Sequence, residues 1–255
     1  MTQQERVTGM VISSMPVGEY DKRVVILTAE RGKIHGFMHG ARKPGSSLMA
    51  SSEPFAFGTF EVYESRTAYR ITSAGITQYF EQLRTDLDAA LYGFYFLEFA
   101  DYYGRENADD KEMLKLLYVS VMALCRRRIP LELIRRIFEL RVMAVNGEGP
   151  QVFECVSCRR RENLHHFSLR LGGMVCDACR EKIRRGSIAV SPTCLYTMRY
   201  IVSSPYEKLF GFTLSDEVMK ELSSITDRFR RIYVDKRFNS LEMIEMQEKL
   251  QKNKH

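Results

Sequence analysis

The chain has 255 residues, of which 45% are apolar, 11% aromatic and 27% charged, and its formal net charge is +6. This composition is that of a globular protein and excludes collagen-like and disordered classes. No apolar run reaches the roughly 18 residues that span a bilayer, and the first residues do not form a signal peptide. We therefore expect a cytoplasmic protein with no membrane partner.

The charge is unevenly distributed along the chain. Residues 80–112 have a net charge of −6, whereas residues 113–185 have 15 basic and 7 acidic side chains. A basic zone of this kind favours a polyanionic partner, most often nucleic acid. A solvated arginine-rich helix face would give the same count, so charge alone leaves both interpretations open.

The first part of the chain reads as short strands separated by glycine-containing turns. The expected strands are 6–14, 22–29, 32–40, 54–63 and 67–77. Five strands in this length predict a small closed barrel of the oligonucleotide/oligosaccharide-binding (OB) type, although an SH3-like barrel has a similar pattern.

One predicted strand carries a possible nucleic-acid surface. In "GKIHGFMHGARK", strict alternation places Lys33, His35, Phe37 and His39 on one face. Cations beside an aromatic ring suit single strands, whose phosphates need positive charge and whose bases stack. A half-buried strand with a polar outer face remains the alternative. With the neighbouring cations, the DNA-binding candidates are Lys22, Arg23, Lys33, Phe37, His39, Arg42 and Lys43.

Beyond residue 79 the periodicity becomes helical. Thr85 or Asp86 is expected to cap a helix that is buried on most sides, and Pro130 begins a later one. Further helices are expected at about 110–126, after Ser191, and after Ser215 or Asp216. The predicted fold is α+β, with a barrel domain at 1–79, an all-α domain at 80–245 containing a cysteine module at 153–186, and a flexible tail at 246–255.

Two Cys-x-x-Cys pairs give the strongest chemical signal. They comprise Cys155 and Cys158, then Cys176 and Cys179. Two such knuckles complete a tetrahedron of thiolates around one ion, so we predict a structural Zn²⁺. His165 and His166 are expected to be loop residues outside the metal shell. A redox role is disfavoured because neither pair is expected to follow a strand, as thioredoxin-like motifs do.

Arginines surround the cysteine module, at positions 159, 160, 161, 180, 184 and 185. They lack the helix register of a base-reading finger, so we expect solvated side chains that touch phosphates at most. Catalytic motifs such as a P-loop, GxSxG or HExxH are absent from the sequence. A binding protein, not an enzyme, is therefore the expectation.

The order of these segments resembles the RecO family of bacterial recombination mediators. The resemblance rests on "VGEYDKRVVILTAERGKIHGFMHGARKPGSS", "EPFAFGTFEVY", "IFELRVMAVNGEGP" and "FSLRLGGMVCDAC", and it covers about residues 3–245. It departs from the family at His39, where a lysine is common.

The resemblance implies an OB domain that binds single- and double-stranded DNA, joined to a helical domain carrying zinc. It also implies annealing of complementary strands, action on DNA coated with single-stranded DNA-binding protein (SSB), and loading of RecA together with RecR in the nucleoid. The alternative is a zinc-containing protein-interaction or RNA-binding module without mediator activity. The family's basic loop falls on residues 40–44 here, with Lys33 preceding it.

Overall fold

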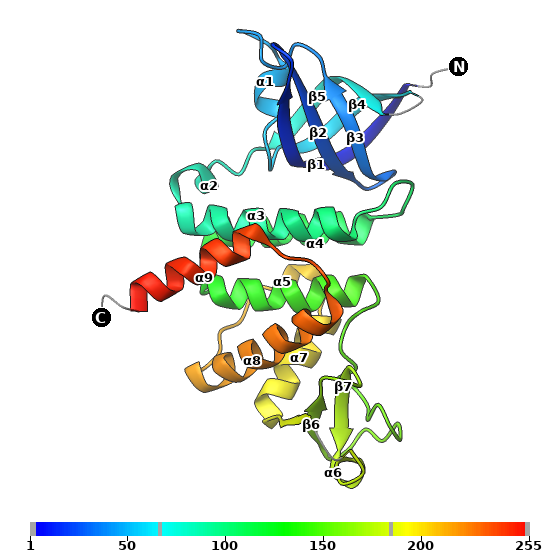
Figure 1. Ribbon diagram of the computed structural model, residues 1–255, viewed down its shortest axis with the longest axis vertical. Helices are drawn as coiled ribbons and strands as arrows, with labels where there is room; N and C mark the ends of the chain where they lie inside the picture. Colours follow the sequence, from blue (N-terminus) through cyan, green and yellow to red (C-terminus); the bar gives the residue numbers. More distant parts are fainter. Residues whose placement is uncertain (1–3, 66–67, 184–185, 253–255) are drawn as a thin grey trace. The chain divides into compact units, whose positions relative to one another are not determined.

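A computed structural model describes residues 4–65, 68–183 and 186–252 of the chain (Figure 1). The chain forms two compact units, one of Met1–Cys125 with Phe238–His255 and one of Arg126–Arg237. The boundary expected between residues 79 and 80 lies inside the first unit and stays a prediction. The helices that follow the barrel pack against it, as the ring contact of Phe57 with Tyr118 illustrates (centroids 4.6 Å apart).

The first unit begins with a closed barrel. Its strands are β1 (Gln4–Val17), β2 (Asp21–Thr28), β3 (Gly32–Met38), β4 (Phe57–Glu64) and β5 (Tyr69–Gln78). Their order is β1-β2-β3-β5-β4, and β1 pairs with β4 to close the barrel. All pairs are antiparallel except β3 with β5. This order and the parallel pair are those of an OB barrel, which confirms that prediction over the SH3-like alternative.

Strand β3 has the predicted alternation. Ile34, Gly36 and Met38 are buried, and the residues between them are half-buried on the outer face. A Cβ on Gly36 would lie 3.0 Å from the backbone oxygen of Tyr69 and 2.1 Å from Ile71 Cδ1, so glycine suits the close approach of β3 to β5. The strand ends at Met38 and not at residue 40 as predicted, so Gly40 lies in the following turn, with φ +68°.

Helices complete the first unit. They are α1 (Leu48–Ser51), α2 (Gln82–Thr85), α3 (Leu87–Tyr103), α4 (Lys111–Arg126) and α9 (Asn239–Lys252). Asp86 caps α3 by accepting a hydrogen bond from Ala89 N at 3.0 Å. Helix α3 is buried on most sides, as predicted, although Leu87 and Phe94 are exposed.

Helix α9 returns to α3 from the end of the chain. The Phe238 ring stacks on Phe99 with centroids 4.4 Å apart, and Ser240 N donates to Glu98 Oε1. The apolar surface of α3 therefore gains a cover that local periodicity did not predict. Residues 246–252 are helical where the sequence predicts a flexible tail, and residues 253–255 lie outside the described residues.

The second unit contains helices and a small sheet. Its main helices are α5 (Leu131–Val145), α7 (Pro192–Ser203) and α8 (Asp216–Tyr233), with a 3-10 turn η1 (Tyr206–Lys208). Ser191 and Ser215 cap α7 and α8, as their sequences predict. The sheet has strand order β7-β6-β8, from β6 (Leu164–Ser168), β7 (Gly173–Cys176) and β8 (Ser187–Ala189), with α6 (Asp177–Arg180) beside it.

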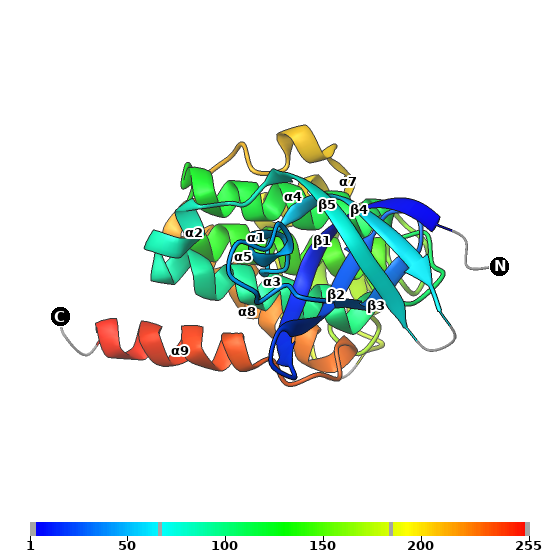
Figure 2. The ribbon, with the colours of Figure 1, turned by 90° about the horizontal axis from the view of Figure 1, so that it is seen from above.

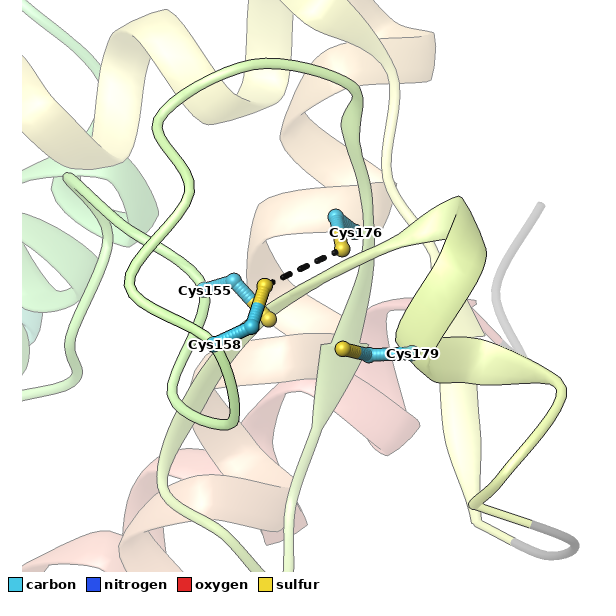
Figure 3. A group of neighbouring side chains, drawn as sticks. All are labelled: Cys155, Cys158, Cys176 and Cys179. Atoms are coloured by element: carbon cyan, nitrogen blue, oxygen red, sulfur yellow. Dashed lines mark hydrogen bonds between the residues drawn. The ribbon is translucent and has the colours of Figure 1, made fainter.

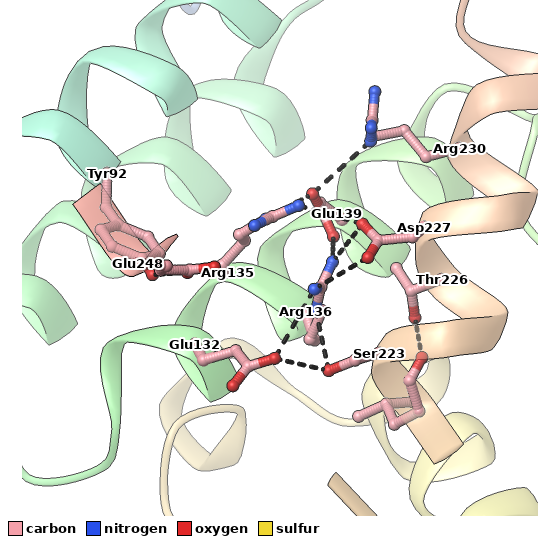
Figure 4. A network of polar contacts seen from close by, with 11 residues as sticks. Tyr92, Glu132, Arg135, Arg136, Glu139, Ser223, Thr226, Asp227, Arg230 and Glu248 are labelled. Carbon is pink, nitrogen blue, oxygen red and sulfur yellow. Dashed lines mark hydrogen bonds and ion pairs between the residues drawn. The ribbon is translucent and has the colours of Figure 1, made fainter. Parts of the chain in front are cut away.

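Charged side chains are buried between α5 and α8 (Figure 4). Glu139 is fully buried and lies 2.9 Å from Arg135 Nε and 3.0 Å from Arg136 Nη1. Asp227 of α8 is 2.6 Å from Arg136 Nη1 and 3.0 Å from Arg135 Nη2. Because buried charges must be paired, this network links α5 to α8.

Within the described residues, none of the helices is both long and apolar enough to cross a membrane.

Candidate metal centre and nucleic-acid interface

The four cysteines of the two Cys-x-x-Cys pairs converge on one point (Figure 3). Their sulfur atoms all lie within 4.8 Å of one another, and Cys158 Sγ is 3.6 Å from Cys176 Sγ. A tetrahedral ion with metal–sulfur bonds of about 2.3 Å separates its sulfurs by about 3.8 Å. The cluster therefore fits a single ion, and its four protein ligands leave no position for a substrate.

The local backbone conformation directs the sulfurs of each Cys-x-x-Cys pair toward one point. The first knuckle is closed by Arg159 N, which donates to Cys155 O at 2.9 Å, and Arg159 itself has φ +63°. Cys176 ends strand β7, and Cys179 lies in α6. The prediction that neither pair follows a strand is thus wrong for the second pair. Its helix has only four residues, however, and the sulfurs of both pairs face one another.

The cluster also favours thiolate at one ligand. Burial raises the pKa of the Cys155 thiol. Hydrogen bonds from the backbone N–H groups of Cys176, Ser157 and Cys158 lower this pKa by more than burial raises it, so the pKa is about 6. In Cys179, by contrast, the contact with Cys158 and burial raise the pKa to about 12. Neighbouring thiolates repel one another, and a divalent cation at their centre removes that penalty.

His165 and His166 lie in strand β6 and not in a loop, which corrects the sequence interpretation. His165 Nδ1 is 3.0 Å from Asp177 Oδ2, and His166 Nε2 is 3.4 Å from Asp177 Oδ1. Both rings are therefore directed to a carboxylate beside the metal centre. Neither belongs to the group of possible metal ligands among the described residues.

The cysteine module is packed into the second unit. Arg199 of α7 donates from Nε to Val152 O at 2.8 Å and lies over the Phe153 ring. Phe167 of β6 contacts Phe229 of α8 edge to face, with centroids 5.8 Å apart. The module therefore connects two helices of this unit, and an ion held by its cysteines would stabilise that connection.

Arginines on the module are exposed but not all unpaired. Arg159 Nη1 is 2.6 Å from Glu154 Oε1, and Arg161 lies 3.9 Å from the same carboxylate. Arg160 and Arg180 are also exposed. Arg184 and Arg185 lie outside the described residues.

The outer face of the barrel carries a second arrangement of interest. Phe37 of β3 pairs with Arg23 of β2 on one side and with Arg70 of β5 on the other. Paired residues point to the same face of a sheet, and both arginines are exposed. Met15 and Tyr63 extend this row at its two ends. We call these five residues the barrel row.

Two of the predicted DNA contacts are engaged within the protein. Lys22 Nζ lies 2.5 Å from Glu53 Oε1, and its side chain is 13% exposed. Lys33 Nζ lies 2.6 Å from Asp101 O. Both amines are therefore already partnered by acidic residues of the first unit, and their role in binding stays an untested prediction.

The loop after β3 holds the other predicted cations. Asp21 accepts from His39 Nδ1 at 2.7 Å and from Gly40 N at 2.8 Å, which fixes the start of the loop. The Gly40 N–H and then His39 lower the pKa of Asp21. Arg42 and Lys43 are exposed, and Lys43 Nζ lies 5.6 Å from the centre of the Tyr20 ring. Lys43 and His39 line an open hollow of about 750 Å³ beside this loop.

Three residues of the barrel row are not among the DNA-binding candidates from the sequence: Met15, Tyr63 and Arg70. Arg70 lies in a predicted strand, but its position beside Phe37 depends on the parallel pairing of β3 with β5. The buried network of α5 was not predicted from the sequence either. The i, i+3 and i, i+4 spacing of its arginines to Glu139 was a visible signal.

Comparison with known proteins covers both units. Residues 1–80 match the family described as Recombination protein O N terminal, and residues 84–242 match Recombination protein O C terminal. These matches include both the barrel and the metal module.

Individual relatives agree over almost their full length. The chain is 27% identical to DNA repair protein RecO of Acetivibrio thermocellus over 94% of this chain and 95% of the relative. It is 28% identical to DNA repair protein RecO of Alkaliphilus metalliredigens, over 92% of this chain and 96% of the relative. A third DNA repair protein RecO, from an Exiguobacterium species, is 26% identical over 98% of each chain.

Proposed function

The chain belongs to the RecO family of DNA repair proteins, and we propose that it binds single- and double-stranded DNA through the outer face of its barrel. It would then anneal complementary strands, act on DNA coated with SSB, and help RecR to load RecA. The observation that carries the DNA-binding step is the strand register, which pairs Phe37 with Arg23 on one side and with Arg70 on the other.

The barrel row suits single strands for a physical reason. An aromatic face accepts any base by stacking, at about 1–3 kcal/mol per base, while guanidinium groups neutralise phosphates. The exposed Arg42 and Lys43 of the loop after β3 extend this positive surface. We leave Lys22 and Lys33 out of the proposed contact surface because their amines bind acidic side chains.

The metal is proposed to be Zn²⁺, held by Cys155, Cys158, Cys176 and Cys179. Thiolate ligands in a closed tetrahedron are typical of structural zinc. The ion would supply no chemistry to substrates and would stabilise the module that connects α7 with α8.

The test is fluorescence anisotropy of the full chain with labelled single-stranded DNA at several salt concentrations. Replacing Arg23→Ala and Arg70→Ala together removes two phosphate contacts, so the slope of log affinity against log salt should fall by about 1.4. Phe37→Ala should instead weaken binding about 5- to 150-fold with little change in slope. Lys220→Ala, an exposed cation on α8, is the control for charge.

The barrel-row mechanism would be refuted if DNA affinity did not change with salt concentration, or if the double arginine variant had the same affinity and salt slope as wild type. A preference for RNA over DNA of equal sequence would favour the RNA-binding alternative. The mediator step is tested by annealing of complementary strands coated with SSB, where the Phe37 and arginine variants should lose rate in proportion to their DNA affinity.

A further inference from the structure

Helix α9 has an apolar face that its own unit does not cover in the described residues. Met243, Met246 and Leu250 are 60%, 65% and 54% exposed. The opposite face packs on α3, where Ile244 is buried and Tyr92 Oη donates to Glu248 Oε1 at 3.1 Å (red helix in Figures 1 and 2). The helix is therefore apolar on two sides.

The exposed residues have the spacing of a helix–helix seam. Positions i, i+3 and i+7 place Met243, Met246 and Leu250 in one stripe along the helix. Glu242 and Lys249 are exposed, and because they are seven residues apart they lie on the same flank of this stripe. The flank is thus acidic near the start of the stripe and basic near its end.

We propose that this stripe docks on the same stripe of a second copy of the chain, with the two α9 helices antiparallel about a two-fold axis near Met246. In that register Met243 faces the second copy's Leu250, and Met246 faces its own counterpart. Residues on one flank meet the same flank of the other helix, so Glu242 of each copy faces Lys249 of the other. In a parallel pair about a two-fold axis, the two flanks would lie on opposite sides of the seam, so Glu242 and Lys249 would not meet.

The size of the stripe determines how strong this association is. Three partly exposed side chains per copy form a contact much smaller than a standard specific interface, which involves about 20–30 residues a side. The dimer is therefore weak and forms reversibly as concentration rises. If the proposed DNA binding holds, several copies on one DNA raise the local concentration, and the dimer brings together two barrels, one per strand.

The experiment measures sedimentation equilibrium of the full chain without DNA, from micromolar to near-millimolar concentrations. Its outcome is independent of the proposed DNA binding. A monomer–dimer equilibrium is expected, and Met246→Glu should abolish it by placing two carboxylates at the axis. Leu87→Glu, which changes an equally exposed apolar side chain on α3, is the matched control and should leave the equilibrium unchanged.

A charge-reversal cycle tests the orientation. Glu242→Lys and Lys249→Glu should each weaken the dimer about 3- to 30-fold, because each alters two symmetric pairs. The double variant should return close to the wild-type equilibrium. The proposal is overturned if the chain is a monomer at every concentration, or if Met246→Glu still forms the dimer. It is also overturned if the double variant dimerises no more tightly than the single variants.

Discussion

Lys33 Nζ contacts Asp101 twice, at 2.6 Å from its main-chain oxygen and 3.2 Å from Oδ1. The pair joins strand β3 of the barrel to helix α3, and the lysine side chain is only 18% exposed. A residue that the sequence suggests as a DNA contact is therefore part of the attachment between the barrel and its first long helix.

We expect Lys33→Met to lower the free energy of unfolding by about 1 kcal/mol, because it removes a partly buried charged hydrogen bond and keeps the aliphatic packing. The salt slope of DNA binding should not change. Urea unfolding and salt-dependent anisotropy measure the two effects. A reduced slope with unchanged stability would show that Lys33 contacts phosphate after all.

The pair of Asp21 with Gly40 predicts a pH dependence. The Gly40 N–H and then His39 lower the pKa of Asp21 below its ordinary value of 3.8, because both bind the ionised form. The carboxylate therefore contributes stability above pH 3.8, and this contribution is lost as pH falls through the lowered pKa.

The measurement is the melting temperature of wild type and Asp21→Asn from pH 7 to strongly acidic pH. Wild type should be more stable at neutral pH, and the difference should close below pH about 3.8. Glu19→Gln removes a charge from the same turn without breaking the bond to Gly40, so it controls for net charge. An equal difference at all pH values would contradict the assignment.

Loss of the metal should affect stability and not DNA affinity. We expect Cys176→Ser to release one zinc per chain, measured by elemental analysis, and to lower the melting temperature by about 6–12 °C for a loss of about 3 kcal/mol. The barrel lies in the other unit, so the salt slope should be retained. Cys125→Ser, outside the cluster, should keep its zinc. If the folded Cys176→Ser variant no longer bound DNA, the cysteine module would itself contact DNA.

The buried network should tolerate the loss of a carboxylate poorly. Glu139→Gln leaves Arg135 and Arg136 with one fewer buried counter-charge, so we expect a loss of about 3–5 kcal/mol in denaturant unfolding. Glu132→Gln alters a side chain that is 46% exposed and should cost less than about 1 kcal/mol. Equal effects of the two substitutions would rule out burial as the cause.

Several elements could be predicted because their signals are local. The N-cap at Asp86, the helix start at Ser191 and the alternation in β3 each depend on neighbouring residues. Helix α9 could not be predicted as part of the barrel's unit, since its partner α3 lies about 150 residues earlier. For the same reason the position of Arg70 beside Phe37 could not be predicted, because it depends on the pairing of two strands that are distant in the sequence.

The sequence by itself determined the family, the barrel and the grouping of four cysteines, because residue spacing within short segments decides which atoms can come together at one point or on one face. The tertiary structure decided how the charged side chains are used. It directed Lys22 and Lys33 to acidic partners, left Arg23 and Arg70 exposed on either side of Phe37, and exposed the stripe on α9. The physical reason is that the function of a cation depends on its nearest counter-charge, and that partner is chosen by folding over long sequence distances.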